Sequence, residues 1–322
     1  MHLLTILFDN LCALPILCFI AGIICSMLGL KRLYHPKIQS LLIYYLLLAI
    51  GLKGGSSFVD HATTHFFFLL SSMMLWGILQ PFVCYWLLRK FTQLDAATSA
   101  AIGCCFGSVS LMTFAAGTAF LDNQQVPYET VVIPLMAIME IPAIFSGVFI
   151  SKWKNLSSKV SSTNLWIHTL VNKTILVIFF GLVIGWIFRR LGLDSVTKQA
   201  LIPFKPCLYV FLLSMGVVIG HHKRDLHQFT WSLAFFGCYM PLIGAAFGLL
   251  ISYCFGLSPG TGTLIALLSA SASYIAVPAA MKIALPEAKE TIYLPLSLAI
   301  AFPFNILIGI PVYYKIARTI LG

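Results

Sequence analysis

Residues 103–117 read GCCFGSVSLMTFAAG, and residues 269–284 read SASASYIAVPAAMKIA. Each stretch places small and hydroxyl residues in the middle of a long apolar run. Gly107 lowers helix propensity, and Pro278 removes a backbone donor and crowds the preceding turn. Both helices are therefore predicted to unwind near their centres, around residues 107–110 and 270–273. The alternative explanation is close helix packing through small residues.

The composition around these stretches indicates a membrane protein. Of the 322 residues, 60% are hydrophobic and 9% are charged, whereas a soluble domain carries about 25% charged residues. Apolar runs repeatedly reach the roughly 20 residues that span the hydrocarbon core of a bilayer. Ten such runs cover residues 9–30, 38–55, 66–89, 96–120, 127–151, 171–191, 200–220, 229–256, 260–284 and 291–317.

The basic residues predict the orientation in the membrane. The net charge of +10 does not indicate nucleic-acid binding, because the Lys and Arg residues lie in short loops between apolar runs. With Lys53 and Lys205 left out because they lie within or close to runs, thirteen fall on one side and five on the other, which places the polar stretch 152–170 in the cytoplasm and both termini outside. The nine Cys have no metal-ligand spacing with a His and are expected to be small apolar fillers.

The stretch 152–170 divides the runs five and five, and the halves 1–151 and 171–322 match each other. The matched positions keep an offset between 159 and 165: Gly22 with Gly181, Ala49–Gly51 with Ser214–Gly216, Gln80-Pro81 with Met240-Pro241, Gly107–Ser110 with Ala270–Ser273, Pro134 with Pro295 and Pro142 with Pro303. Because five is odd, the second half enters the membrane from the opposite side. Such inverted repeats are a common plan of secondary transporters. The sequence thus predicts an all-α integral membrane protein of ten transmembrane helices in two inverted five-helix repeats, with the fourth and ninth helices discontinuous.

The predicted helix breaks are the expected binding sites for ions. Freed backbone groups cannot be satisfied by lipid, so the breaks must line a protein cavity. The second half-helices are predicted to begin near Val109–Leu111 and Ser273–Tyr274, with unpaired amides and the positive end of the dipole. Two such starts would bind a small anion without a buried Arg. The carbonyls that end the first half-helices, with the Ser hydroxyls, are oxygen ligands suited to a small cation.

Three polar residues within the runs leave alternatives open. Glu140 is the one acid deep in a run, where a charge is costly, and its repeat counterpart is Ala301. It could handle an ion, be a protonated hydrogen-bonding group, or support unwound backbone. Asn305 could offer oxygen to an ion or bridge helices. Lys53 could snorkel to the interface, form a salt bridge, or act on the anion through its field.

The absence of catalytic motifs argues against an enzyme. The sequence contains no H-E-x-x-H, no two acids on facing runs, and no His at the depth of Ser110 that could activate it. No cofactor is expected.

At these residues the chain resembles the sodium-dependent bicarbonate transporter family of cyanobacteria and other bacteria. The resemblance covers nearly the whole chain and is carried by LLAIGLKGG (47–55), GSVSLMTF (107–114), MEIPAI (139–144), SASASYIAVPAAMKIALPEA (269–288) and YLPLSLAIAFPFN (293–305). It implies a plan similar to bile-acid symporters and sodium/proton antiporters, with a core domain that moves against a gate domain, and a homotrimer in the bacterial cytoplasmic membrane. It also implies that bicarbonate is carried with sodium as the coupling ion, both bound around the unwound segments.

The resemblance assigns candidate residues. The candidates for the substrate are Gly107, Ser108, Ser110, Leu111, Ser271, Ser273 and Tyr274. The candidates for sodium are Ser108, Thr113, Ser269, Ser271, Glu140 and Asn305. Leu111 and Met112, which follow the GSVS motif of residues 107–110, are bulkier than the resemblance leads us to expect and could reshape the pocket. A PII-like signalling protein docks on some family members, and the short central linker leaves this partnership open here.

Two other functions remain open at this stage. The same fold could carry a different small organic anion, such as a carboxylate, with sodium. A membrane enzyme or sensor could also retain a transporter-like fold.

Overall fold

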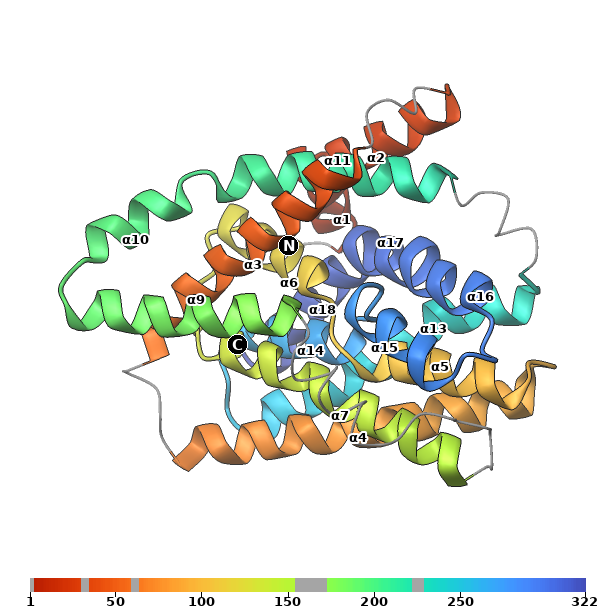
Figure 1. Ribbon diagram of the computed structural model, residues 1–322. Coiled ribbons are helices and arrows are strands. Elements are labelled where there is room, and N and C mark those ends of the chain that lie inside the picture. The colour runs from red at the N-terminus through yellow and green to blue at the C-terminus, as the bar shows by residue number, and fades with distance from the viewer. Residues whose placement is uncertain (1–2, 30–34, 59–63, 154–172, 222–228) are drawn as a thin grey trace.

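The computed structural model describes residues 3–29, 35–58, 64–153, 173–221 and 229–322, and every regular element in these ranges is a helix (Figure 1). The helices of the first half are α1 (Leu3–Leu11), α2 (Leu14–Met27), α3 (Pro36–Phe58), α4 (Thr64–Phe91), α5 (Ala96–Gly107), α6 (Leu111–Asn123) and α7 (Val132–Trp153). Those of the second half are α9 (Lys173–Arg190), α10 (Asp194–Leu201), α11 (Phe204–His221), α13 (Trp231–Cys254), α14 (Pro259–Ala270), α15 (Ala276–Ala284), α16 (Glu290–Pro295), α17 (Phe302–Phe304) and α18 (Ile310–Ile320).

The helices confirm a multi-pass membrane protein. Within the described ranges, six helical stretches are long and apolar enough to cross a bilayer, and α1 with α2, bent by 59°, makes a seventh. Two shorter apolar helices, 132–147 and α14, add to these. The count of ten spans stays a prediction, and most of the predicted linker 152–170 lies outside the described residues.

The last span departs from a regular α-helix. Two π-helical segments, η2 (Leu296–Ala301) and η3 (Asn305–Gly309), flank the short α17. Pro295 and Pro303 cannot donate to the helical ladder, so the hydrogen-bond pattern shifts around them. Short π segments inside α-helices are frequent at functional sites.

Four helices form one group through contacts between glycines. α2 packs on α11 and α3 packs on α9. A Cβ on Gly22 would lie 2.1 Å from the Leu213 carbonyl oxygen, and a Cβ on Gly216 would lie equally close, 2.1 Å, to that of Phe19. Gly51 and Gly181 face each other in the same way. In the sequence repeat, Gly22 corresponds to Gly181 and Gly51 corresponds to Gly216. The repeat therefore maps the Gly22–Gly216 contact onto the Gly181–Gly51 contact.

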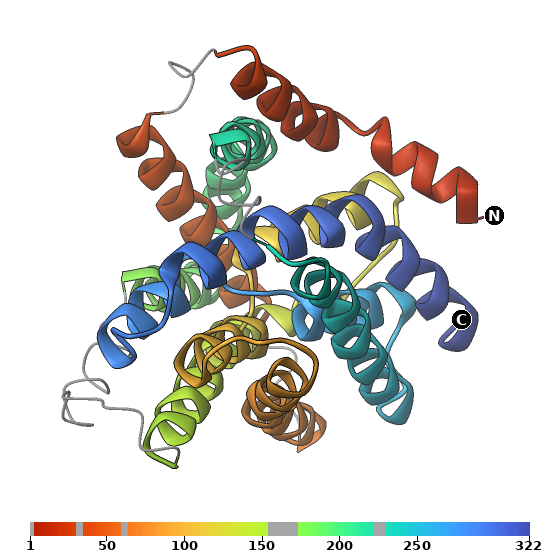
Figure 2. The same cartoon turned by 90° about the vertical axis from the view of Figure 1, so that its right-hand side faces the viewer.

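Apart from α10, which packs on α3 and α9, the remaining helices form a second group around the broken spans. α4 packs on α5 in the first half as α13 packs on α14 in the second. The last span, drawn in blue, runs across the molecule between the helices of both groups (Figure 2). The two breaks lie inside the helical assembly, because residues 108–110 and 271–274 are buried.

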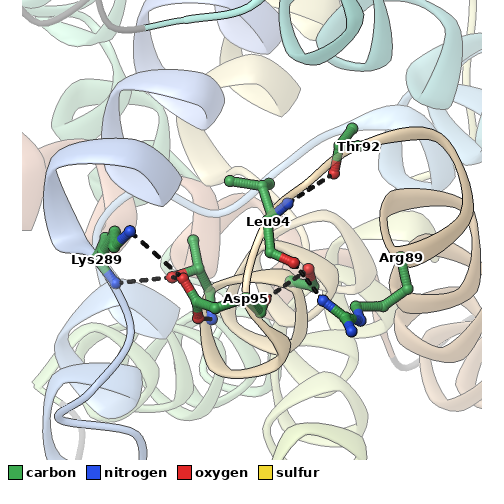
Figure 3. A network of polar contacts seen from close by, with 7 residues as sticks. Arg89, Thr92, Leu94, Asp95 and Lys289 are labelled. Atoms are coloured by element: carbon green, nitrogen blue, oxygen red, sulfur yellow. Dashed lines mark hydrogen bonds and ion pairs between the residues drawn. The ribbon is translucent and has the colours of Figure 1, made fainter.

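Hydrogen bonds from the opposite half hold the starts of the first half-helices. Asp95 caps α5 by accepting from the Thr98 amide at 2.7 Å, and the Thr98 hydroxyl accepts from the Lys289 amide at 3.0 Å (Figure 3). Ser258 caps α14 through the Thr261 amide, and the Thr261 hydroxyl accepts from the Glu129 amide at 2.9 Å.

These anchors follow the sequence repeat. An offset of 163 relates Asp95 to Ser258 and Thr98 to Thr261, and an offset of 160 relates Glu129 to Lys289. The first anchor also includes an ion pair, since Lys289 Nζ lies 3.7 Å from Asp95 Oδ2 at an exposed position. Arg89 also donates to the Leu94 carbonyl in the turn before α5.

The glycine contacts predict a graded loss of stability. Gly22→Ala is expected to cost about 1–3 kcal/mol or more of unfolding free energy, because the added methyl would overlap backbone atoms of α11. Gly77→Ala is the control, since its nearest neighbour would be the Pro142 Cβ at 3.3 Å. Thermal unfolding of the detergent-solubilised variants measures both. Equal losses would contradict the proposed backbone contact.

Candidate functional site

Both predicted helix breaks are present. α5 ends at Gly107 and α6 begins at Leu111, which confirms the first break at its predicted residues. α14 ends at Ala270, but α15 begins at Ala276, so the predicted start near Ser273–Tyr274 is wrong. Pro278 explains the later start, because it occupies the first turn of α15, where its missing N–H is not needed.

The two breaks cross and are joined by hydrogen bonds. The Ser110 amide donates to the Ser271 hydroxyl at 2.9 Å, and that hydroxyl donates to the Leu268 carbonyl at 3.1 Å. The Ser273 amide donates to the Cys105 carbonyl at 2.8 Å. All these groups are buried. Backbone freed in each half is thus satisfied by the other half.

The crossing departs from the repeat at one residue. The offset of 163 relates Ser108 to Ser271, Ser110 to Ser273 and Cys105 to Leu268. By symmetry the Ser273 amide would bond the Ser108 hydroxyl, yet it bonds the Cys105 carbonyl instead. Ser108 Oγ is buried and has no hydrogen-bond partner in the described part of the chain. Of these two equivalent serines, Ser271 is used by the fold and Ser108 is not.

Two serine hydroxyls accept amides at the starts of the second half-helices, Ser110 as the N-cap of α6 and Ser273 from the segment before α15. Ser110 Oγ accepts from the Thr113 amide at 3.2 Å and from the Thr113 hydroxyl at 2.8 Å. Ser273 Oγ accepts from the Val277 amide at 3.3 Å. The first amides of an α-helix have no intrahelical acceptor, so the amides of Leu111 and Met112 remain for another partner.

Side-chain amides close the end of α14. Gln80 Nε2 donates to the Ser269 carbonyl and Asn305 Nδ2 to the Ala270 carbonyl, each at 3.1 Å. The Asn305 Oδ1 accepts from the Tyr313 hydroxyl at 2.9 Å. Of the two roles open for Asn305, bridging helices is the one that this structure shows. Gln80 was not among the predicted site residues. The feature that could have indicated it is a single polar amide side chain within an apolar run.

A small pocket lies at the starts of the two second half-helices. Its empty volume is about 240 Å³, counting space open to solvent. Its lining consists of Val109, Ser110, Leu111, Met112, Glu140, Ser273, Tyr274, Ile275 and Ala276. Glu140 Oε2 and the Tyr274 hydroxyl are buried without a hydrogen-bond partner among the described residues. The pocket therefore joins two helix starts, a phenol and a carboxyl group.

The other predicted residues lie outside this lining. Ser108, Thr113, Ser269 and Ser271 are buried in or beside the crossing. Gly107 has a packing role, since a Cβ there would lie 2.4 Å from Pro81 Cγ on α4.

Aromatic contacts connect the pocket to the glycine-paired helices. The Tyr274 ring meets that of Phe302 edge-on, with centroids 5.3 Å apart, and Phe302 meets Phe19 of α2 at 5.7 Å. Lys53 of α3 does not line the pocket and donates to the Tyr128 hydroxyl in the segment between α6 and α7. Both contacts join one helix group to the other.

A family model matches most of the chain. The model of the Na⁺-dependent bicarbonate transporter superfamily matches residues 15–318. The chain belongs to this superfamily. It is therefore a transporter and not an enzyme, and the family implies bicarbonate and sodium as its substrates. No curated protein matches the chain.

The two equivalent serines predict opposite effects on stability. Ser271→Ala is expected to cost about 1–3 kcal/mol, because it leaves the buried Ser110 amide without its acceptor. Ser108→Ala should change stability little, because the removed hydroxyl has no partner among the described residues. Thermal unfolding of the two variants checks this. A larger loss for Ser108→Ala would refute the assignment.

Proposed function

We propose that this transporter imports bicarbonate together with sodium across the bacterial cytoplasmic membrane by alternating access. The observation that carries the proposal is the pocket where the starts of α6 and α15 meet, in a chain of this superfamily. Sodium is the coupling ion, and no other cofactor takes part.

The anion is proposed to bind at the two helix starts. Leu111, Met112 and Ala276 are first-turn residues that line the pocket, and helix starts favour negative charge. The Tyr274 hydroxyl adds a donor, while Ser110 and Ser273 hold the two helix starts in place. The bulky side chains of Leu111 and Met112 favour a compact anion.

Sodium is proposed to bind on the other side of the crossing. The structure uses Ser271 Oγ, the Ser269 carbonyl and the Asn305 amide for its own hydrogen bonds. The Ser108 hydroxyl is unused, and it lies next to the carbonyl end of α5, a kind of helix end that coordinates sodium in transporters. Ser108 and the last carbonyls of α5 are thus the favoured ligands.

Alternating access rests on the proposed inverted repeat of ten spans. The exchanged glycine contacts and the paired anchors at Thr98 and Thr261 support it. The proposed gate domain comprises α2, α3, α9 and α11, and the broken spans belong to the core domain. The homotrimer, both termini outside, and a PII-like partner on the cytoplasmic face remain proposals from the family resemblance and the charge distribution.

Sodium coupling predicts the result of an uptake assay. Radiolabelled bicarbonate should accumulate in proteoliposomes only under an inward sodium gradient, because both ions must bind before the carrier reorients. Potassium in place of sodium is the control. Uptake that is indifferent to sodium would overturn the coupling, and stronger competition by formate or acetate than by unlabelled bicarbonate would indicate a carboxylate cargo.

Filling the pocket predicts a loss of transport without a loss of assembly. Ser273→Leu and Ser110→Leu should each reduce uptake to background, because a Leu side chain occupies the space at a helix start. Ser71→Leu, on the exposed face of α4, is the matched control and should transport normally. Size-exclusion chromatography checks that all three variants assemble alike. Normal uptake by Ser273→Leu would refute this placement of the cargo.

A further inference from the structure

The first span is divided between the two helix groups. Its first part, α1, packs on η3 and α18, whereas its second part, α2, packs on α11. The two parts meet at an angle of 59°, in the red helices of Figure 2. The bend therefore lies at the boundary between the group that holds the crossing and the group that is joined through glycines.

Asn10 fastens α1 to the last span. Its side chain is 4% exposed, and Nδ2 donates to the Ile306 and Leu307 carbonyls at 3.0 and 3.2 Å. These carbonyls lie in η3, one turn before Pro311, which has no amide hydrogen to offer them. α1 thus supplies two donors to a stretch in which the helical hydrogen-bond ladder is interrupted.

The same stretch of the last span is joined to the crossing. η3 begins with Asn305, whose Nδ2 donates to the Ala270 carbonyl at the end of α14 at 3.1 Å. Hydrogen bonds therefore connect α1 through η3 to the second break. A displacement of the crossing should carry η3 and α1 with it.

α2 is fixed to the other group by contact between backbones. A Cβ on Gly22 would lie 2.1 Å from the Leu213 carbonyl oxygen of α11, so no side chain separates the two helices there. Toward the broken spans, Phe19 of α2 meets Phe302 edge-on, an apolar contact without a hydrogen bond. Because a ring contact of this kind tolerates small shifts, the firmer link of α2 is the one to α11.

A proline explains the joint between the two parts. In a continuous helix, residue 15 would donate to the Leu11 carbonyl, but Pro15 has no hydrogen to donate. α1 accordingly ends at Leu11, Ala13 is extended with φ −66° and ψ 137°, and α2 begins at Leu14.

A cavity beside the joint leaves room for movement. Its empty volume is about 420 Å³, counting space open to solvent. Ala13 and Ile16 line it from the joint, and Ala116 and Phe120 line it from α6 in the other group. The angle between α1 and α2 can therefore change without an immediate clash between these side chains.

We infer that the first span consists of two arms with a hinge at residues 12–13. α1 moves with the broken spans, α2 stays with α11, and backbone rotation at the hinge takes up the motion between them. This inference rests on the alternating access proposed above. It assigns α1, which its place in the chain would group with α2, to the part of the protein that carries the ions.

Hydrogen–deuterium exchange of the purified protein tests the division, because it reports local opening and needs no cargo. Asn10→Leu removes both donors, so amides in α1 and η3 should exchange about tenfold faster than in the wild type, while those in α2 keep their rates. Gly22→Ala should have the reverse effect, with faster exchange in α2 and α11 and unchanged exchange in α1.

Asn123→Leu is the matched control, because Asn123 lines the same cavity at an exposed position on α6, and it should exchange as the wild type does. Asn10→Ala replaces the Leu variant if that variant does not fold. Faster exchange of α1 and α2 together in the Asn10 variant would show a single rigid span and overturn the inference. Unchanged exchange of α1 would overturn it as well.

Straightening the joint tests the hinge. Pro15→Ala restores an amide hydrogen for the Leu11 carbonyl, so α1 and α2 can join into one helix. Sodium-driven uptake should fall about fivefold while the thermal unfolding temperature does not fall, because a hinge is lost and no packing contact is removed. Pro36→Ala, at the exposed start of α3, is the control and should transport normally. Normal uptake by Pro15→Ala would refute the hinge.

The two measurements separate this inference from the proposed function. If the wild type shows no sodium-driven uptake but Asn10→Leu loosens α1 without α2, the proposed coupling is wrong and the division into two arms stands. If the wild type transports but α1 and α2 exchange as one unit, the proposed function stands and the division is wrong.

Discussion

The hydrocarbon core contains no water, and this constraint governs the structure around the two breaks. Every amide and carbonyl freed there must find a partner inside the protein. The Ser271 hydroxyl and the Cys105 carbonyl take amides from the opposite break, while Gln80 and Asn305 take the carbonyls that end α14. The crossing is therefore held by the same bonds that make broken helices tolerable in a membrane.

Against this background, the unpartnered groups are the informative ones. Where most buried polar atoms at the crossing are satisfied, Ser108 Oγ, Glu140 Oε2 and the Tyr274 hydroxyl are not, among the described residues. An unsatisfied buried polar group costs free energy unless something else binds it. Ser271 and Ser108 occupy equivalent positions in the sequence repeat, yet only the Ser271 hydroxyl forms hydrogen bonds among the described residues. The two halves of the sequence repeat thus share a scaffold and differ where ions are proposed to bind.

Much of the fold could be predicted from the sequence, because apolar runs and the serine breaks depend on local chemistry. The break at Gly107–Ser110 lies where it was expected. The start of α15 is three residues later than Ser273 because Pro278 fits the first turn. The hydrogen bonds that involve Ser271 but not Ser108 join residues about 160 positions apart in the chain. They form only when the two breaks pack against each other, so local sequence does not predict them. The bridging role of Asn305 and the placement of Glu140 beside the helix starts could not be read from spacing for the same reason.

The burial of the first broken span has a consequence for the surrounding bilayer. In the apolar stretch of Ala96–Asn123 every residue of the most apolar window is buried, whereas fewer than half are buried in those of Pro36–Ser56, His65–Phe91 and Asp194–Gly220. Bilayer thickness and lipid type therefore act on the outer helices through hydrophobic mismatch and do not reach the crossing itself. Lipid composition should therefore act first on the outer helices and little on the groups at the crossing. Polar groups of the protein, and not the surrounding lipid, would thus solvate an ion at the crossing.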